Sequence, residues 1–137
     1  MVKAKGREKA ILGDGAMTTH DIANDLVSLC KAGSFGESGE KYWADNVVSV
    51  EAGGPPGMDP TSHGKDAARA KGEWWAGAHE VHSVAVEGPY VNGEQFIVHF
   101  IMDVTVRESG QRIKMDETAL YTIKDGKIAE ERFFYSG

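Results

Sequence analysis

The chain has 137 residues, of which 41% are hydrophobic and 26% are charged, and its formal net charge is −6 at pH 7. This length and composition are typical of one globular domain. The negative charge argues against nucleic acid or an anionic membrane as a partner. The basic residues Lys65, Arg69 and Lys71 are interrupted by Asp66, which is typical of a solvated helix face. No apolar run approaches the roughly 20 residues that a membrane-spanning helix needs. We therefore expect a cytoplasmic protein with no membrane partner.

The first half of the chain is expected to be mainly helical. Residues 1–17 are predicted to form a flexible N-terminal extension, and the folded domain to span 18–137. A first helix is predicted to begin near Thr19, because Thr18 or Thr19 can cap it. Its apolar positions recur at helical spacing and are Ile22, Leu26, Leu29 and Cys30. A short second helix that contains Tyr42 and Trp43 follows, and β-branched residues predict a strand over 47–51.

The second half of the chain is expected to be mainly β-structure. Residues 53–60 contain three glycines and three prolines in close succession, which predicts a loop. A third helix is predicted over about 65–76. Four extended segments follow, separated by short glycine-containing turns that join antiparallel neighbours; they are 79–87, 94–106, 111–123 and 127–135. Helices followed by a β-meander predict an α+β fold in which the helices pack on one face of the sheet.

Three short runs at these spacings resemble the nuclear transport factor 2-like superfamily, and within it the SnoaL-like group. The runs are Tyr42-Trp43-Ala44-Asp45-Asn46-Val47, His63-Gly64-Lys65-Asp66-Ala67 and Asp125-Gly126-Lys127-Ile128. The resemblance covers residues 18–136. It implies a cone-shaped, mostly antiparallel mixed sheet with three N-terminal helices on its concave face, the cystatin-like α+β barrel. It also implies a pocket for a small hydrophobic molecule.

The known active sites of this superfamily match the chain only in part. Glu51 falls at the position of the general base in ketosteroid isomerases, but the two oxyanion donors of those enzymes fall on Val27 and Ala119. Asp103 falls beside one of the two carboxylates of limonene epoxide hydrolase, whose other two catalytic positions are not matched. Because the superfamily also contains binding domains, the fold does not settle the function.

Strand alternation divides segment 94–106 into two rows of side chains. The resemblance to the isomerases predicts that His99, Ile101 and Asp103 lie on the concave face and point into the pocket. The opposite row, from Phe96 to Val104, is then expected to form an apolar outer face. An exposed apolar face of that size predicts a homodimer through the sheet.

The predicted site combines carboxyl groups with apolar walls. Buried carboxyl groups have raised pKa values and can act as bases near neutral pH. The predicted catalytic residues are Glu51, His99, Asp103 and Glu117. The predicted pocket residues are Trp43, Trp74, Ile101, Glu131, Phe133 and Tyr135. No cofactor is expected, and no metal, since His79 and His82 are three positions apart on a strand and point to opposite faces.

Two functions remain open at this stage. The first is a cofactor-independent isomerase, cyclase, lyase or hydrolase acting on a small hydrophobic substrate. Glu51 would be its base, Asp103 or Glu117 its acid or water-orienting group, and His99 a proton partner. The second is a non-catalytic dimeric module that binds a small molecule or presents a surface to a protein partner.

Overall fold

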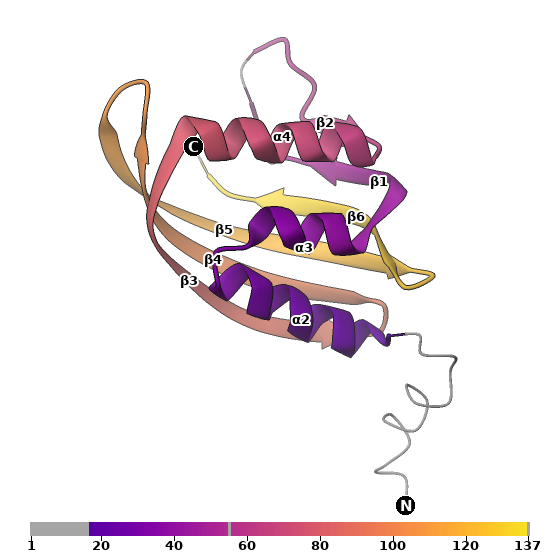
Figure 1. The fold of residues 1–137 in the computed structure, drawn as a ribbon. Coiled ribbons are helices and arrows are strands. Elements are labelled where there is room, and N and C mark those ends of the chain that lie inside the picture. The colour runs from indigo at the N-terminus through magenta and orange to yellow at the C-terminus, as the bar shows by residue number, and fades with distance from the viewer. Residues whose placement is uncertain (1–16, 55, 137) are drawn as a thin grey trace, which may run out of the picture.

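The computed structural model describes residues 17–54 and 56–136, so nearly all of the predicted extension over 1–17 lies outside the described residues. The described chain contains α2 (Thr19–Lys31), α3 (Phe35–Tyr42), β1 (Trp43–Val50), β2 (Thr61–His63), α4 (Lys65–Ala78), β3 (His79–Asn92), β4 (Gln95–Val106), β5 (Gln111–Lys124) and β6 (Lys127–Phe134) (Figure 1). None of the described helices has the length and apolar character required to cross a membrane.

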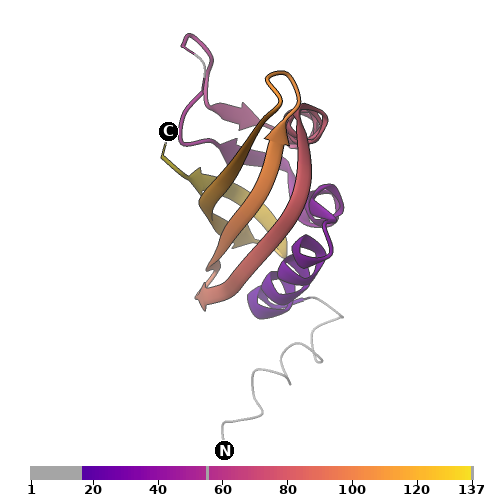
Figure 2. The same cartoon turned by 90° about the vertical axis from the view of Figure 1, so that its left-hand side faces the viewer.

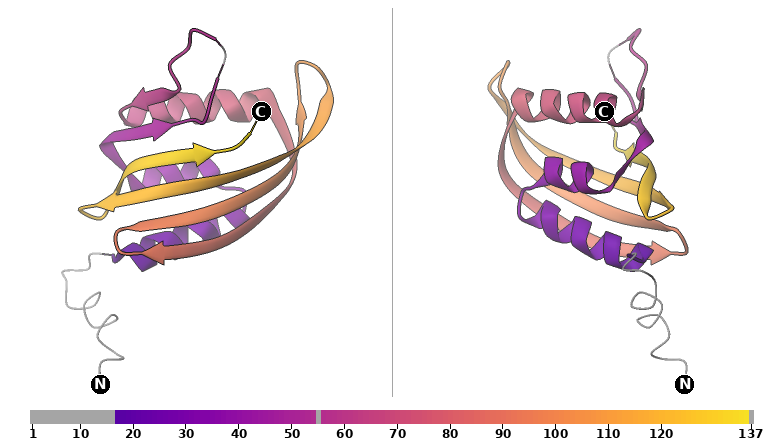
Figure 3. Two further views of the ribbon diagram at one scale, coloured as in Figure 1. Left: turned by 180° about the vertical axis from the view of Figure 1, so that it is seen from behind. Right: turned by 45° about the vertical axis from the view of Figure 1, so that its right-hand side comes forward.

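The strands form one curved sheet in the order β2-β1-β6-β5-β4-β3. Only the β1–β6 pair is parallel, and every other neighbouring pair in this sheet is antiparallel. The three helices lie on one face of the sheet, as the side view shows (Figure 2). Figure 3 shows the opposite face from behind, with no described helix covering it. The predicted α+β architecture, with helices packed on the concave face of a mixed sheet, is confirmed.

The first helix begins where its capping residue predicts. The Thr18 hydroxyl accepts a hydrogen bond from the Asp21 N–H at 3.1 Å, and the Asp21 carboxylate accepts one from the Thr18 N–H at 3.0 Å. This reciprocal pair satisfies two backbone donors that the first turn leaves without partners. The buried stripe of α2 then packs on the sheet and consists of Ile22, Ala23, Leu26, Val27 and Cys30.

The junction between β1, β2 and α4 is built around Gly64. Its φ of +94° is rarely adopted by residues with a Cβ. The Gly64 N–H donates to the Val47 carbonyl at 2.8 Å, and the Gly64 carbonyl accepts from the Ala68 N–H at 3.0 Å. One residue therefore links β1 to the first turn of α4. A shallow surface depression beside this junction is lined by Asp45, His63, Gly64, Lys65 and Asp66.

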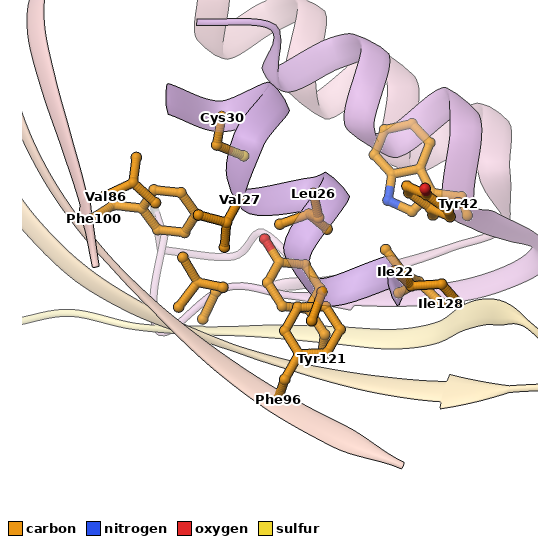
Figure 4. Close-up of a cluster of buried hydrophobic side chains, with 14 of the residues drawn as sticks. Ile22, Leu26, Val27, Cys30, Tyr42, Val86, Phe96, Phe100, Tyr121 and Ile128 are labelled. Atoms are coloured by element: carbon orange, nitrogen blue, oxygen red, sulfur yellow. The ribbon is translucent and has the colours of Figure 1, made fainter. Parts of the chain in front are cut away.

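The predicted sidedness of segment 94–106 is wrong. The row expected to form the outer face is buried beneath the helices, with no side chain more than 5% exposed, and consists of Phe96, Val98, Phe100, Met102 and Val104. Figure 4 shows Phe96 and Phe100 of this row among the buried side chains. The reason is the pairing of β4 with β5, which places Phe96 opposite Tyr121 and Phe100 opposite Glu117. Directly opposed residues share a face, so this row lies on the inner face with Tyr121 and Glu117.

The homodimer itself stays a prediction. The row from Phe96 to Val104 lies in the protein core and is not available to a second copy. A dimer through the sheet would have to use the outer face, where Ile97 is 40% and Phe134 is 49% exposed.

Two neighbouring residues of β4 test this sidedness. Phe96→Ala should lower the free energy of unfolding by about 3–5 kcal/mol, because it removes a buried ring that stacks on Tyr121. Ile97→Ala should cost less than about 1 kcal/mol, because Ile97 is part-exposed on the outer face. Urea denaturation of both variants measures the difference. Equal losses at the two positions would contradict the assignment.

Candidate functional site

The inner face of the sheet is fully buried beneath α2 and α3 but only half-buried at the end nearer α4. Val98 and Ala119 are fully buried, and Tyr121 is 5% exposed. Farther along β5 toward its N-terminal end, Met115 and Glu117 are only half-buried. The half-buried side chains at this end of the inner face come from β5, β6 and the segments that follow β1 and β6, so this end is less completely covered than the rest.

A buried carboxyl group lies at the deep end of this region. Glu131 is 6% exposed, and both of its oxygens accept hydrogen bonds. Oε1 accepts from Trp43 Nε1 at 2.9 Å, and Oε2 accepts from Ser49 Oγ at 2.6 Å. Ser49 and Glu131 are directly paired across the parallel strands β1 and β6, which explains how residues 82 positions apart meet.

A lysine from α4 continues this hydrogen-bonded chain toward solvent. Lys71 Nζ donates to Ser49 Oγ at 2.5 Å and to Glu51 Oε2 at 2.6 Å. The ammonium group also lies over the Phe133 ring, 5.2 Å from its centroid. The Tyr135 hydroxyl donates to the other oxygen of Glu51 at 2.9 Å. Glu51 is therefore held between a cation and a phenol.

Glu117 completes the group from the neighbouring strand β5. Burial, and then the charge of Glu51, raise the pKa of its carboxyl to about 7, against an opposing effect of Lys71. Its carboxyl makes no hydrogen bond to another described residue. We refer to the whole group as the inner polar cluster, which comprises Trp43, Ser49, Glu51, Lys71, Glu117, Glu131 and Tyr135.

The tyrosine of this cluster is a hydrogen-bond donor and not a base. Burial, and then the hydrogen bond to Glu51, raise the pKa of the Tyr135 phenol to about 12. The phenol therefore keeps its proton at neutral pH. The group in the cluster best suited to exchange a proton near pH 7 is Glu117, because its pKa lies at that pH.

The structure brings together about half of the predicted site residues. Those that meet on the inner face are Trp43, Glu51, Glu117, Glu131, Phe133 and Tyr135. Trp74 is not among them, since it is 69% exposed. The adjacent Trp75 packs against the core instead and lies one helical turn from Lys71.

Ser49 and Lys71 are members of the cluster that the sequence analysis missed. Lys71 was assigned to a solvated helix face, but its side chain is only 24% exposed. The available signal was its spacing from Ala68 and Trp75, at three and four positions, which places the three residues on one side of a helix. Ser49 could have been found from the alternation of Val47, Ser49 and Glu51 along one strand.

His99, Ile101 and Asp103 lie on the outer face, where the two charged residues pair with side chains of the neighbouring strands. His99 Nδ1 lies 2.7 Å from Glu87 Oε1, and its Nε2 lies 2.6 Å from Asp116 Oδ1. Asp103 accepts two hydrogen bonds from Arg112, at 2.9 and 2.8 Å. The arginine lowers the pKa of Asp103. The predicted placement of His99, Ile101 and Asp103 on the inner face is thus wrong, because this strand is turned the other way, and none of the three can join the inner site.

The arrangement of the described residues does not suggest a metal centre. No group of three or more His, Cys, Asp or Glu side chains within residues 17–54 and 56–136 could hold a metal ion. A metal-free and cofactor-free site stays a prediction.

The outer-face histidine should make stability depend on pH. Hydrogen bonds that His99 donates to Asp116 and then to Glu87 raise its pKa above 6.5. The stabilisation is then complete below about pH 6.5 and is lost as the pH rises through the raised pKa. His99→Gln should therefore lower the urea midpoint more near pH 6 than near pH 9. A pH-independent difference would contradict this account.

Glu117 should also make stability fall as the pH rises, but by adding a cost rather than by losing a stabilising contact. Its folded pKa of about 7 exceeds the ordinary value of 4.5, so between these values the folded state binds more protons and stability falls as the pH rises. Glu117→Gln removes this cost and should raise stability by up to about 3 kcal/mol near pH 8, with little change near pH 4. Denaturation at the two pH values measures it. No gain at the higher pH would show that the carboxyl is not desolvated.

Comparisons with known proteins agree with this fold. The model of the SnoaL-like domain family matches residues 17–135. A solved structure from Mesorhizobium loti, provisionally named a SnoaL-like polyketide cyclase with the added words carbohydrate phosphatase, is 51% identical; the match covers 87% of this chain and 100% of that one, with a TM-score of 0.82.

More distant structures share the fold alone. A provisionally named isomerase from Bacillus subtilis is 18% identical over 88% of this chain and 90% of that one, with a TM-score of 0.73. A protein with a ketosteroid isomerase-like fold from Catenulispora acidiphila is 15% identical over 87% and 88%, with a TM-score of 0.66. A comparison with curated proteins gives no match. The family match and the 51% identity confirm the resemblance seen in the sequence, and the chain belongs to the SnoaL-like domain family.

Proposed function

We propose that this SnoaL-like chain is a cofactor-independent enzyme that moves a proton on a small, uncharged, largely apolar carbonyl compound. Glu117 is the general base, and Lys71 stabilises the oxyanion. The single observation that carries the proposal is the Glu117 carboxyl, which is free of hydrogen bonds to described residues, half-buried on the inner face, and has a pKa of about 7. A base with a pKa near the working pH transfers protons efficiently.

The base role moves from Glu51, the residue expected from the resemblance, to Glu117. Both oxygens of Glu51 are occupied, one by Lys71 and the other by Tyr135. These two contacts hold the Glu51 carboxyl in place, whereas the Glu117 carboxyl accepts no hydrogen bond from a described residue. Glu51 instead holds Lys71 in place and supplies the negative charge that helps to raise the pKa of Glu117.

Lys71 is the group that can stabilise developing negative charge. An ammonium group has three protons, and Ser49 and Glu51 account for two of them. The third can donate to a carbonyl oxygen of the substrate. Glu117 would remove a proton from the adjacent carbon, and the C–H electron pair would form the enolate, whose oxygen is stabilised by Lys71. Return of the proton to another carbon isomerises the substrate, while attack of the enolate carbon on a second carbonyl cyclises it.

The charge and lining of the site favour an uncharged substrate. Met115, Trp75 and Phe133 supply apolar surface around the cluster, and three carboxyl groups are present with a single ammonium. A phosphate dianion would be repelled by this balance. Of the two activities in the name of the M. loti protein, the cyclase therefore fits the inner polar cluster better than the phosphatase.

Proton exchange at carbon tests the proposal without a known substrate. The protein is incubated in D2O with a panel of small cyclic ketones and 1,3-diketones, and deuterium uptake is followed by NMR. The wild type should accelerate uptake at the carbon next to the carbonyl, with a rate that rises through about pH 7. Glu117→Gln should reduce that rate by roughly 10²- to 10⁴-fold.

Asp116→Asn is the matched control, since Asp116 precedes Glu117 on the same strand and lies on the outer face with His99. Its exchange rate should equal that of the wild type. Retention of exchange by Glu117→Gln would disprove the base assignment. Tight ketone binding by a wild type that catalyses no exchange would leave the non-catalytic binding module as the function.

A further inference from the structure

We propose that Glu131 is a positioning residue, which fixes the direction of the Lys71 ammonium group through the Ser49 hydroxyl. Glu131 itself lies in the core, one residue removed from any group that a ligand would contact. The use of this device in catalysis rests on the proposed function, but the geometry and its test do not.

Trp43, Glu131, Ser49 and Lys71 form a hydrogen-bonded chain, and its two end groups determine the direction of every hydrogen bond in it. The Trp43 indole can only donate, and so can the Lys71 ammonium. Ser49 Oγ therefore accepts from Lys71 at 2.5 Å. The single proton of the Ser49 hydroxyl is left for Glu131 Oε2, at 2.6 Å. The carboxyl oxygens of Glu131 thus accept both of their hydrogen bonds, and the lone pairs of Ser49 are turned toward α4.

The buried end of this hydrogen-bonded chain is rigidly packed. Trp43 is 8% exposed, and Ser49 has no exposed surface. Gly39 of α3 lies so close to the Trp43 ring that a Cβ at this position would overlap the indole. Because the indole cannot move toward α3, its N–H stays directed at Glu131. A buried carboxyl group supported in this way holds the Ser49 hydroxyl in one orientation.

The orientation of the Ser49 hydroxyl affects Lys71, at the outer end of the hydrogen-bonded chain. Lys71 is long and flexible, and an ammonium on such a side chain adopts many directions unless several contacts fix it. Glu51 and the Phe133 ring provide two contacts near solvent. Ser49 provides the third, and it is the one that reaches the core. With Ser49 and Glu51 as fixed acceptors, the remaining N–H has one preferred direction.

Substitution of Glu131 by glutamine should disturb the hydrogen bonds of Ser49 while leaving a side chain of nearly the same size in place. The new amide has an NH2 group that can donate to Ser49 Oγ, so the hydroxyl proton loses its acceptor and the lone pair that receives Lys71 is no longer held in one direction. Lys71 would then be held by fewer contacts and spend more time as an accessible amine. Ser49→Ala removes the acceptor directly and should have the same effect, whereas Ser49→Thr retains the hydroxyl.

The measured quantity is the acetylation rate of Lys71 by N-acetoxysuccinimide, determined by peptide mass spectrometry relative to the exposed Lys114. Glu131→Gln and Ser49→Ala should each raise this ratio roughly 3- to 10-fold, as expected for loss of one hydrogen bond to a charged group. The double variant should be no faster than either single variant, because both changes break the same connection. Ser49→Thr should keep the wild-type rate.

Glu130→Gln is the matched control, since Glu130 adjoins Glu131 but pairs with Arg132 rather than with the cluster. Its Lys71 rate should equal that of the wild type. An unchanged rate in a folded Glu131→Gln protein, or independent and multiplicative effects of the two single variants, would overturn the proposal. Should Glu131→Gln not fold, equal rates for Ser49→Ala and Ser49→Thr would overturn it. None of these readouts depends on ketone exchange, so failure of the proposed function is recognised separately.

Discussion

The pairing of β4 with β5 is the constraint on which the core and the candidate site both depend. It places Phe100 opposite Glu117 and Phe96 opposite Tyr121, and opposed residues share a face of the sheet. Burial of the Phe96 row beneath α2 and α3 therefore commits Glu117 to the inner face as well. The same register turns Asp103 outward, where Arg112 is its partner. One hairpin thus places Glu117 where it is desolvated and Asp103 where it forms a surface ion pair.

Much of the architecture could be predicted from local patterns, but the sidedness of β4 could not be read from that strand alone. The cap at Thr18 and the turns between the last four strands follow from local chemistry. In β4 both rows contain large apolar residues, such as Phe100 in one and Ile101 in the other, so alternation defines two faces without saying which is inside. The resemblance to the distant isomerases places β4 one residue out of register, and a shift of one residue exchanges the two faces of a strand. The hairpin register points to the correct face, because it pairs Phe100 with Glu117, a residue predicted to lie in the site.

The site was predicted where charge and alternation agree, and missed where tertiary packing overrides local character. Glu117 and Glu131 are carboxyl groups on strand rows that also hold core residues, which is a signal visible in the sequence. Lys71 lies among other charged residues of α4, and such a segment usually indicates a solvated face. Only the docking of α4 across β1 carries Lys71 inward. Trp75, and not its neighbour Trp74, faces the core for the same reason.

The junction at Gly64 has a consequence for what the family signature can indicate. The His63-Gly64-Lys65-Asp66 run shapes a bend of positive φ that attaches α4 to β1, and it contributes no member to the inner polar cluster. This run of the family signature is thus a structural junction, while the proposed reactive groups Glu117 and Lys71 lie at separate positions on β5 and α4. Relatives can keep the joint and exchange the reactive groups one by one, so that a shared signature is compatible with divergent chemistry.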